Sequence, residues 1–199
     1  LKASGGDPKQ LYVLIYFGWN EHWYRDMGTE ATGKFGFGSD GWKRAFASWL
    51  TALRDFYMKK GFTYEQIAIK TLDEPYGDPA DKKTSGYIAV QGARYIKDVD
   101  PKIRTMCNPN TDATNAQYLD EYFKVYDILE PYIGHVQGNQ AVIDKLRRSG
   151  RELWVYGIYG KETPPNSYRN LYWFSAANGF SGCCAFWCYI YNAGDAFNS

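Results

Sequence analysis

Two neighbouring acids, Asp73 and Glu74, stand at the end of an apolar segment and directly before Pro75. Two carboxyls that share a pocket repel each other when both are ionised, so one tends to keep its proton while the other stays charged. That division suits acid/base catalysis, in which one group donates a proton and the other stabilises positive charge. The pair therefore predicts a catalytic site. The plainer alternative is a solvated strand end at which Asp73 caps a turn.

The position of the pair in its segment favours the catalytic interpretation. Adjacent strand residues point to opposite faces of a sheet, so both acids reach one pocket only where the strand ends and bends. Pro75 supplies that bend, because the residue before a proline is kept out of the helical region. We expect Asp73 and Glu74 to share a pocket at the carboxyl end of this strand.

Strand-like and helix-like segments alternate along the chain. Apolar, β-rich runs occupy residues 11–17, 66–72, 103–107, 125–129, 153–159 and 182–191. Apolar residues at helical spacing occupy residues 42–60, 85–98, 115–124, 139–149 and 168–178, with Asp40 as a candidate N-cap of the first and glycines after several. This alternation predicts parallel strands joined by right-handed crossovers, hence the α/β class.

The number of strands indicates an incomplete barrel. A (β/α)8 TIM-type barrel needs eight strands and typically about 250 residues, whereas this chain offers six strands in 199 residues. A nucleotide-binding open sheet is disfavoured, because no glycine-rich phosphate loop follows any strand. We therefore predict one domain over residues 1–199, a (β/α)8 TIM-type barrel that lacks its first two β/α units.

Polar and aromatic side chains follow nearly every predicted strand, and barrel active sites lie at the carboxyl ends of the strands. Aromatic residues make up 18% of the chain, and their flat faces suit stacking on sugar rings. This composition predicts a carbohydrate site with Asp73 and Glu74 as its catalytic residues. The predicted substrate-binding residues are Trp19, Asn20, His22, Asn108, Tyr159, Trp187 and Tyr189.

Other titratable residues have weaker claims. Glu130, at another strand end, is the main candidate for a second catalytic carboxylate, followed by Glu162, but a loop acid before Pro131 is the favoured interpretation of Glu130. His22 and His135 are isolated in the sequence, so we predict no metal site. The four cysteines form no C-x-x-C pair.

The charge balance narrows the classes of partner. Lys and Arg number 23 and Asp and Glu number 22, a net charge of +1, which argues against nucleic acid or an anionic membrane as partner. No apolar run approaches the roughly 20 residues of a membrane-spanning helix. No cofactor motif is present, so we predict that the site uses no cofactor.

Three stretches resemble the catalytic barrel of glycoside hydrolase family 123 and related glycosidases with an Asp-Glu-Pro motif. They are TLDEPYGD, RELWVYGIYG and YRNLYWFSAANGFSGCCAFWCYIYNAGD, and the similarity in order and spacing covers roughly residues 60–195. The resemblance implies that the strands here are numbers three to eight of the barrel. It also implies that an N-terminal β-sandwich and the first barrel units are missing from this chain.

The resemblance further implies a mechanism. Glu74 would be the general acid/base, and Asp73 would orient the substrate's 2-acetamido group, whose carbonyl oxygen attacks to form an oxazoline. The expected substrates are β-linked N-acetylhexosaminides, N-acetylgalactosaminides first, in an oligosaccharide or glycoconjugate. A secreted or periplasmic location and association with the missing barrel portion or another chain are also implied.

Two other functions stay open at this point. One is a two-carboxylate glycosidase acting on other sugars. The other is a barrel remnant that binds carbohydrate without turnover. A binding module would keep the aromatic residues but would not require the Asp73–Glu74 pair.

Overall fold

The computed structural model describes residues 13–16, 36–159 and 163–187, and the side chains of 13–16 and 185–187 are not described. The strands are β1 (Val13–Tyr16), β2 (Ile67–Lys70), β3 (Arg104–Cys107), β4 (Ile128–Leu129), β5 (Glu152–Tyr159) and β6 (Gly182–Trp187). The α-helices are α2 (Asp40–Lys59), α3 (Ser85–Val99), α4 (Leu119–Phe123), α5 (Ile133–Val136), α6 (Gln140–Arg148) and α7 (Pro165–Asn178). Two 3-10 helices, η4 (Tyr64–Gln66) and η5 (Ala116–Tyr118), complete the elements.

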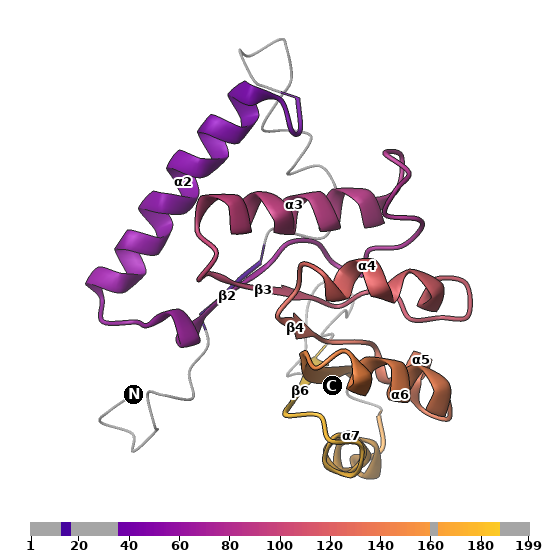
Figure 1. The fold of residues 1–199 in the computed structure, drawn as a ribbon. Helices are drawn as coiled ribbons and strands as arrows, with labels where there is room; N and C mark the ends of the chain where they lie inside the picture. The colour runs from indigo at the N-terminus through magenta and orange to yellow at the C-terminus, as the bar shows by residue number, and fades with distance from the viewer. Residues whose placement is uncertain (1–12, 17–35, 160–162, 188–199) are drawn as a thin grey trace, which may run out of the picture.

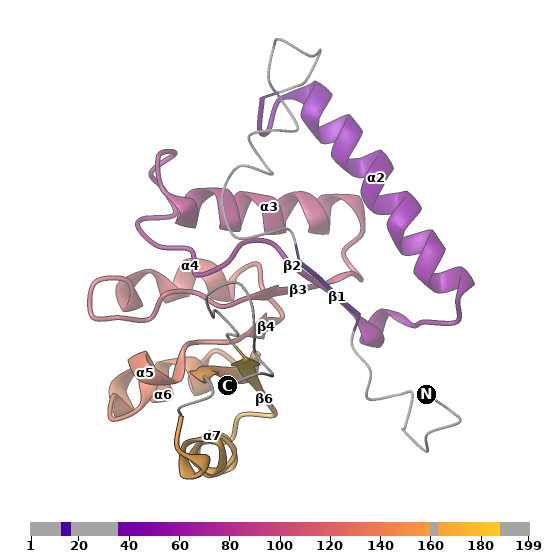
Figure 2. The ribbon, with the colours of Figure 1, turned by 180° about the vertical axis from the view of Figure 1, so that it is seen from behind.

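The six strands form one sheet in the order of the sequence, and all neighbouring strands are parallel. The sheet is curled, and the helices between strands pack outside it one after another, from α3 through α4 and α6 to α7 (Figure 1; Figure 2 from behind). The predicted α/β class and sequential strand order are therefore confirmed. The arrangement is consistent with an incomplete TIM-type barrel, and the numbering of its strands as three to eight stays a prediction.

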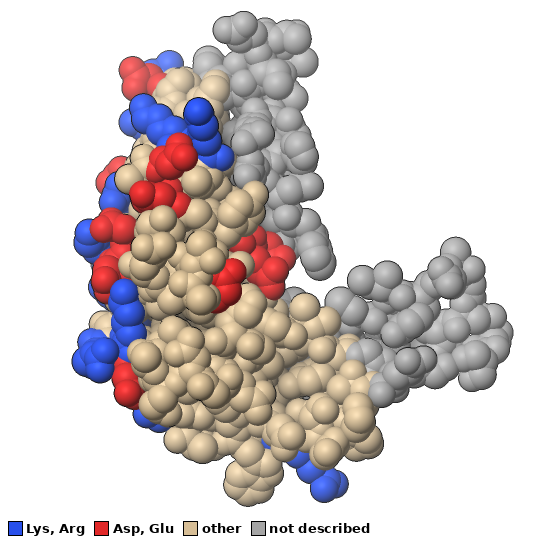
Figure 3. Space-filling model, turned by 90° about the vertical axis from the view of Figure 1, so that its right-hand side faces the viewer, with Lys and Arg blue, Asp and Glu red and all other residues tan. Residues whose placement is uncertain are grey.

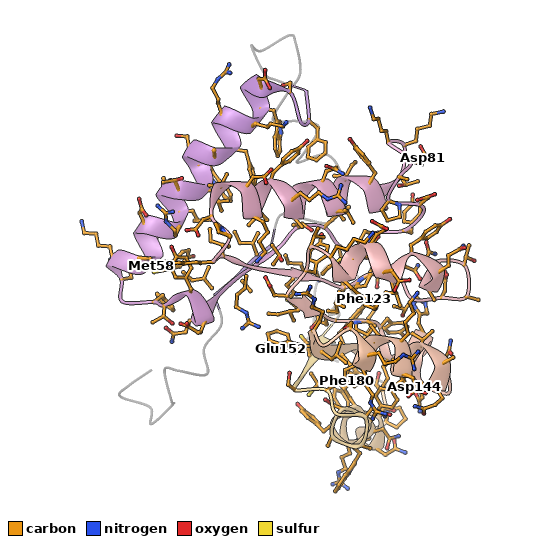
Figure 4. All side chains as sticks on the ribbon, in the orientation of Figure 1. Met58, Asp81, Phe123, Asp144, Glu152 and Phe180 are labelled. Carbon is orange, nitrogen blue, oxygen red and sulfur yellow. The ribbon has the colours of Figure 1, made fainter. Side chains whose placement is uncertain are left out.

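The main core lies between the sheet and the helices. Ile69 of β2, Cys107 of β3 and Leu129 of β4 pack there against helix residues such as Ile96. Figure 4 shows side chains filling this layer, with Phe180 beside α7, where its ring lies 5.9 Å from that of Phe174. A second, smaller cluster lies on the other face of the strands and consists of Ala68, Met106 and Ile128, with Trp154 packed against it. The two clusters correspond to the outer and inner faces of a curled sheet, because side chains alternate along each strand.

The helix ends follow local sequence signals, with one correction. Helix α2 is capped by Ser39, whose hydroxyl accepts a hydrogen bond from the Trp42 N–H, whereas Asp40, the predicted cap, is the first helical residue. Ser39 has the extended backbone that an N-cap requires. Gly179 ends α7 in the left-handed conformation, as predicted. The short helix α5 was not predicted.

The described surface carries no large patch of one charge on the face shown in Figure 3. Basic and acidic side chains alternate along one margin of that view, and much of the rest is uncharged. None of the helices in the described ranges is long and apolar enough to cross a membrane. The wider statements about partners stay predictions.

Candidate active site

A polar layer lies directly above the inner cluster, towards the carboxyl ends of the strands. Its members follow the residues of that cluster by two positions, and side chains two apart in a strand share a face. They are Lys70 after Ala68, Asn108 after Met106, and Glu130 after Ile128. All three are buried. Along β2, β3 and β4 the inner face of the sheet therefore changes from apolar to polar or charged over two residues.

Asn108 joins the two predicted catalytic residues. Its Nδ2 donates a hydrogen bond to Asp73 Oδ1 at 2.8 Å, and its Oδ1 accepts one from the Glu74 backbone N–H at 3.1 Å. One buried amide thus fixes the side chain of the first acid and the main chain of the second. The structure brings together Asp73, Glu74 and Asn108.

Lys70 is a residue that the sequence analysis missed. Its Nζ lies 3.0 Å from Asp73 Oδ1 and 4.0 Å from Glu130 Oε2. The signal was a single lysine inside the apolar run IAIKT, which could have been recognised as facing the same side as Ala68. One ammonium therefore lies between two carboxyl groups from different strands.

The loop that carries the acid pair is held at successive residues. The Asn110 N–H donates to the Pro75 carbonyl at 3.1 Å. The Tyr76 N–H donates to Ser85 Oγ at 2.9 Å, and the Gly77 N–H donates to an Asn115 side-chain oxygen at 2.7 Å. The loop is thus fixed to the end of β3 and to the start of α3, and it holds the carboxyls in a defined place.

Glu74 has an unusual backbone and an exposed side chain. Its φ is +41°. No other non-glycine residue in the described ranges has a positive φ. Such strain, on the order of 1–3 kcal/mol, persists only where the surroundings enforce it, and it gathers at functional sites. Partial desolvation and the neighbouring Asp73 raise the pKa of Glu74, while His135 and Lys70 oppose that rise. Glu74 thus combines access to solvent with a raised proton affinity.

His135 is less isolated than its sequence context indicated. It lies in α5, its ring centroid is 5.3 Å from that of Tyr132, and its charge lowers the pKa of Glu74. Its Nδ1 is buried and has no hydrogen-bond partner in the described part of the chain. His135 is therefore a neighbour of the site that chain position alone did not reveal.

Glu130 lies just after β4 and before Pro131, as the sequence analysis favoured, but it is buried. It is 2% exposed, and its N–H donates to the Cys107 carbonyl at 2.8 Å, so it continues the pairing of β4 with β3. Burial raises its pKa to about 7, although Lys70 lowers it, and the charge of Asp73 adds to the rise. Its burial follows from period-two alternation, which turns Glu130 inward with Ile128.

Tyr159 lies on the other face of β5. It is buried in the main core with Val155, and its ring centroid is 4.7 Å from that of Tyr168 in α7. The structure does not bring it to the cluster of Lys70 and Asp73 by any contact that it describes. Trp19, Asn20, His22 and Tyr189 lie outside the described residues, as does the side chain of Trp187, so their sugar-binding roles stay predictions.

Two further features bear on what the site could hold. In the described ranges, no three His, Cys, Asp or Glu residues are grouped as metal ligands, and the expectation of a metal-free site stays a prediction. A cavity of about 460 Å³ lies on the outer surface, where Tyr87 and Gln91 of α3 face Tyr118 of η5. It shares no residue with the cluster at the strand ends, so it is separate from the candidate site.

Comparison with known proteins finds similarity among solved structures. No protein-family model and no curated protein matches the chain. Among solved structures, the chain is similar to an intracellular xylanase from Thermoanaerobacterium saccharolyticum, solved in complex with xylotriose. The TM-score is 0.58 at 15% sequence identity, over 88% of this chain and 64% of the xylanase. The chain thus spans less than two thirds of the length of that enzyme.

At this identity the likeness shows the fold alone. It supports the interpretation of the curled parallel sheet as part of a TIM-type barrel. In this chain the Asp73–Glu74 loop follows the carboxyl end of β2. Membership of glycoside hydrolase family 123 is not shown.

Proposed function

We propose that this chain is the catalytic part of a glycosidase that acts on β-linked N-acetylhexosaminides, N-acetylgalactosaminides first, with retention and with the substrate's acetamide as nucleophile. The observation that carries the proposal is the contrast between two adjacent carboxyls. Asp73 is held by an ammonium and an amide, whereas Glu74 is exposed and has a raised pKa. The likeness to a xylanase supports the general class of glycosidase and nothing finer.

Glu74 is the proposed general acid and base. The raised pKa favours the protonated form of Glu74, which is the form that a general acid needs. Glu74 donates its proton to the glycosidic oxygen as the bond from that oxygen to C1 breaks. In the second step it takes a proton from the water that attacks C1, as the bond from C1 to the acetamide oxygen breaks and the acetamide is restored.

Asp73 is the proposed partner of the acetamide. Its contacts with Lys70 and Asn108 both involve Oδ1. No hydrogen bond or ion pair from the rest of the described chain reaches Oδ2. In the proposal Oδ2 accepts the acetamide N–H, so that the carbonyl oxygen of the same group forms the new bond to C1. The carboxylate then stabilises the positive charge of the oxazoline-like intermediate.

A two-carboxylate glycosidase is the second candidate, favoured by the position of Glu130 at the neighbouring strand end. A protein nucleophile must be ionised and must reach the anomeric carbon, and in such enzymes it lies about 5–5.5 Å from the acid. Glu130 is 2% exposed and shares Lys70 with Asp73. Its burial argues for a supporting part, so substrate assistance is the first proposal.

The test compares how fast the full chain and its variants hydrolyse glycosides with poor and with good leaving groups. Glu74→Gln is expected to slow alkyl N-acetylhexosaminides by about 10²–10⁴-fold, the usual contribution of a positioned acid, and activated aryl glycosides far less. Asp73→Asn is expected to slow both classes equally, because the charge that it stabilises forms with either leaving group. A thiazoline mimic of the oxazoline should inhibit.

The outcome that rejects this mechanism is efficient hydrolysis of a glycoside with a plain 2-hydroxyl group. Such a result would move the proposal to the two-carboxylate mechanism, with Glu130→Gln as the next variant. Binding of the sugar without turnover of any glycoside would instead identify a carbohydrate-binding barrel.

A further inference from the structure

Lys70 is a buried cation at the centre of the candidate site. It is 3% exposed, and its Nζ lies 3.0 Å from Asp73 Oδ1 and 4.0 Å from Glu130 Oε2. A buried ammonium is tolerated only when nearby acceptors replace its hydration. The two carboxyls provide that replacement, and they come from the ends of two different strands.

The two carboxyls differ in how well they are compensated. Asp73 has the shorter contact with Lys70 and also accepts the amide of Asn108. Glu130 is more deeply buried, and its distance to the ammonium is longer by about one ångström. The ammonium of Lys70 therefore stabilises the carboxylate of Asp73 more than that of Glu130.

The surroundings of Glu130 add no second cation in the described part of the chain. The titratable groups that act on it or feel its charge are Lys70 and Asp73 from β2 and its end, Cys107 from β3, and Cys184 from β6. With both carboxyls ionised, the cluster carries one net negative charge in a buried place. Protonation of Glu130 removes that excess, and burial raises its pKa to about 7.

We propose that Lys70 is a positioning residue for Asp73 and that the proton on Glu130 decides how firmly Lys70 holds it. When Glu130 is protonated, the ammonium of Lys70 pairs with Asp73 alone and fixes its carboxylate. When Glu130 is ionised, it draws the ammonium towards itself and repels Asp73, so the hold on Asp73 loosens. The effect on turnover rests on the proposed function, whereas the coupling of the three groups does not.

The coupling is tested by NMR titration of the side-chain carboxyl carbons in the full chain. One glutamate carboxyl should titrate with a midpoint of about 7, and its signal should be absent from Glu130→Gln, which assigns it. Lys70→Met should move that midpoint upward by one pH unit or more, and Lys70→Arg should restore most of the shift.

Lys97→Met is the matched control. Lys97 forms a half-buried ion pair of 2.6 Å with Asp127, which precedes β4 at the opposite end of the sheet. Its loss should leave the Glu130 midpoint unchanged. A Glu130 midpoint near the usual 4.5 in the unmodified protein overturns the inference without any variant. So does a midpoint that Lys70→Met leaves in place.

Kinetics test the consequence for catalysis. For an aryl N-acetylhexosaminide, whose departure needs little help from Glu74, kcat/KM should fall several-fold as the pH rises through about 7. Glu130→Gln should flatten that limb, because it mimics the protonated acid. Lys70→Met should lower kcat by about 10²-fold at every pH, the usual effect of a misplacement near 1 Å, with a smaller change in KM.

The two parts of the experiment separate the two proposals. A Glu130 midpoint that responds to Lys70, in a protein that hydrolyses no glycoside, supports the coupling and rejects the proposed function. Turnover with a pH profile that Glu130→Gln does not change rejects the positioning role and leaves the proposed function standing.

Discussion

Asn108 uses both ends of its side-chain amide, one on the carboxylate of Asp73 and the other on the main chain of Glu74. Asn108→Ala removes both hydrogen bonds from a buried position. We expect a loss of about 1–3 kcal/mol in the free energy of unfolding. We also expect a fall in kcat of about 10²-fold, because the carboxyls lose their fixed places. Urea denaturation and steady-state kinetics measure the two effects.

Asn115→Ala is the control for this prediction. Asn115 accepts the Gly77 N–H in the same loop but touches neither acid. Asn115→Ala should lower the free energy of unfolding by about as much as Asn108→Ala does, and it should lower kcat much less. Equal losses of kcat in the two variants would show that Asn108 acts by holding the loop and not by holding the acids.

Glu130 makes the stability of the protein depend on pH. Its pKa in the folded chain is about 7, above its usual value of 4.5, so between these values the folded state holds a proton that the unfolded state has released. The contribution of Glu130 to the free energy of unfolding is therefore fully present below about pH 4.5 and is lost as the pH rises to about 7. Glu130→Gln should remove this loss. At pH 8 the free energy of unfolding of the variant should exceed that of the natural chain by on the order of 3 kcal/mol. Urea midpoints measured across this pH range check it, and parallel curves for the two proteins would contradict it.

At the residue scale the sequence predicted the acids but not their support. Asp73 and Glu74 were predicted as the catalytic pair because Asp-Glu-Pro ends an apolar strand, and that role stays a prediction. Lys70 was missed because one polar residue in a strand does not reveal its partners. The burial of Glu130 was missed, because its inward direction depends on where β4 ends.

The first turn of α3 packs against the loop that carries the acids. A Cβ added to Gly86 would lie 2.5 Å from the Gly77 carbonyl oxygen and 3.1 Å from that of Tyr76. Alanine gains about 1 kcal/mol of helix propensity over glycine, but a clash with backbone cannot be relieved by a side-chain rotation and costs about 1–3 kcal/mol. We therefore expect Gly86→Ala to lower the free energy of unfolding and to lower kcat by displacing the loop.

The same helix offers a control for that prediction. Gln91→Ala changes α3 on its outer side, at the surface cavity, and should leave kcat unchanged. Calorimetry and kinetics on both variants check the pair. A Gly86→Ala protein that is more stable and fully active would mean that the loop moves freely away from the helix.

At the element scale the sequence predicted all six strands and the longer helices, because apolar periodicity and glycine stops mark them. It missed α5, since four residues are too few to show a period. It placed the cap of α2 one residue late, because Ser39 and Asp40 are both good N-caps and only the backbone conformation of Ser39 decides between them.

The order of the strands predicts how the molecule opens. Strand β3 lies between β2 and β4, whereas β6 pairs with β5 alone in the described part of the chain. Interior strands usually open only with global unfolding, and edges open earlier. Amide hydrogen exchange should therefore be slower in Arg104–Cys107 than in Gly182–Trp187. Equal protection of both strands would contradict this expectation.

The topology of the whole molecule was accessible from the sequence, because alternating strands and helices leave few arrangements of a parallel sheet. The convergence of side chains was not. Whether Lys70, Asn108 and Glu130 meet depends on strand register and on the curl of the sheet, which no local pattern encodes. Tyr159 illustrates the same limit, since it ends a strand as predicted yet faces the helices.

Because Glu74 has a left-handed backbone conformation, selection for turnover and selection for folding stability favour different residues at position 74. Glycine adopts this conformation without a Cβ clash, so a variant library sorted for protease resistance alone would collect glycine there. Sorting for turnover would keep glutamate. If the proposed function holds, relatives of this chain that have lost activity should carry glycine at position 74 more often than active relatives do, while their folds remain alike.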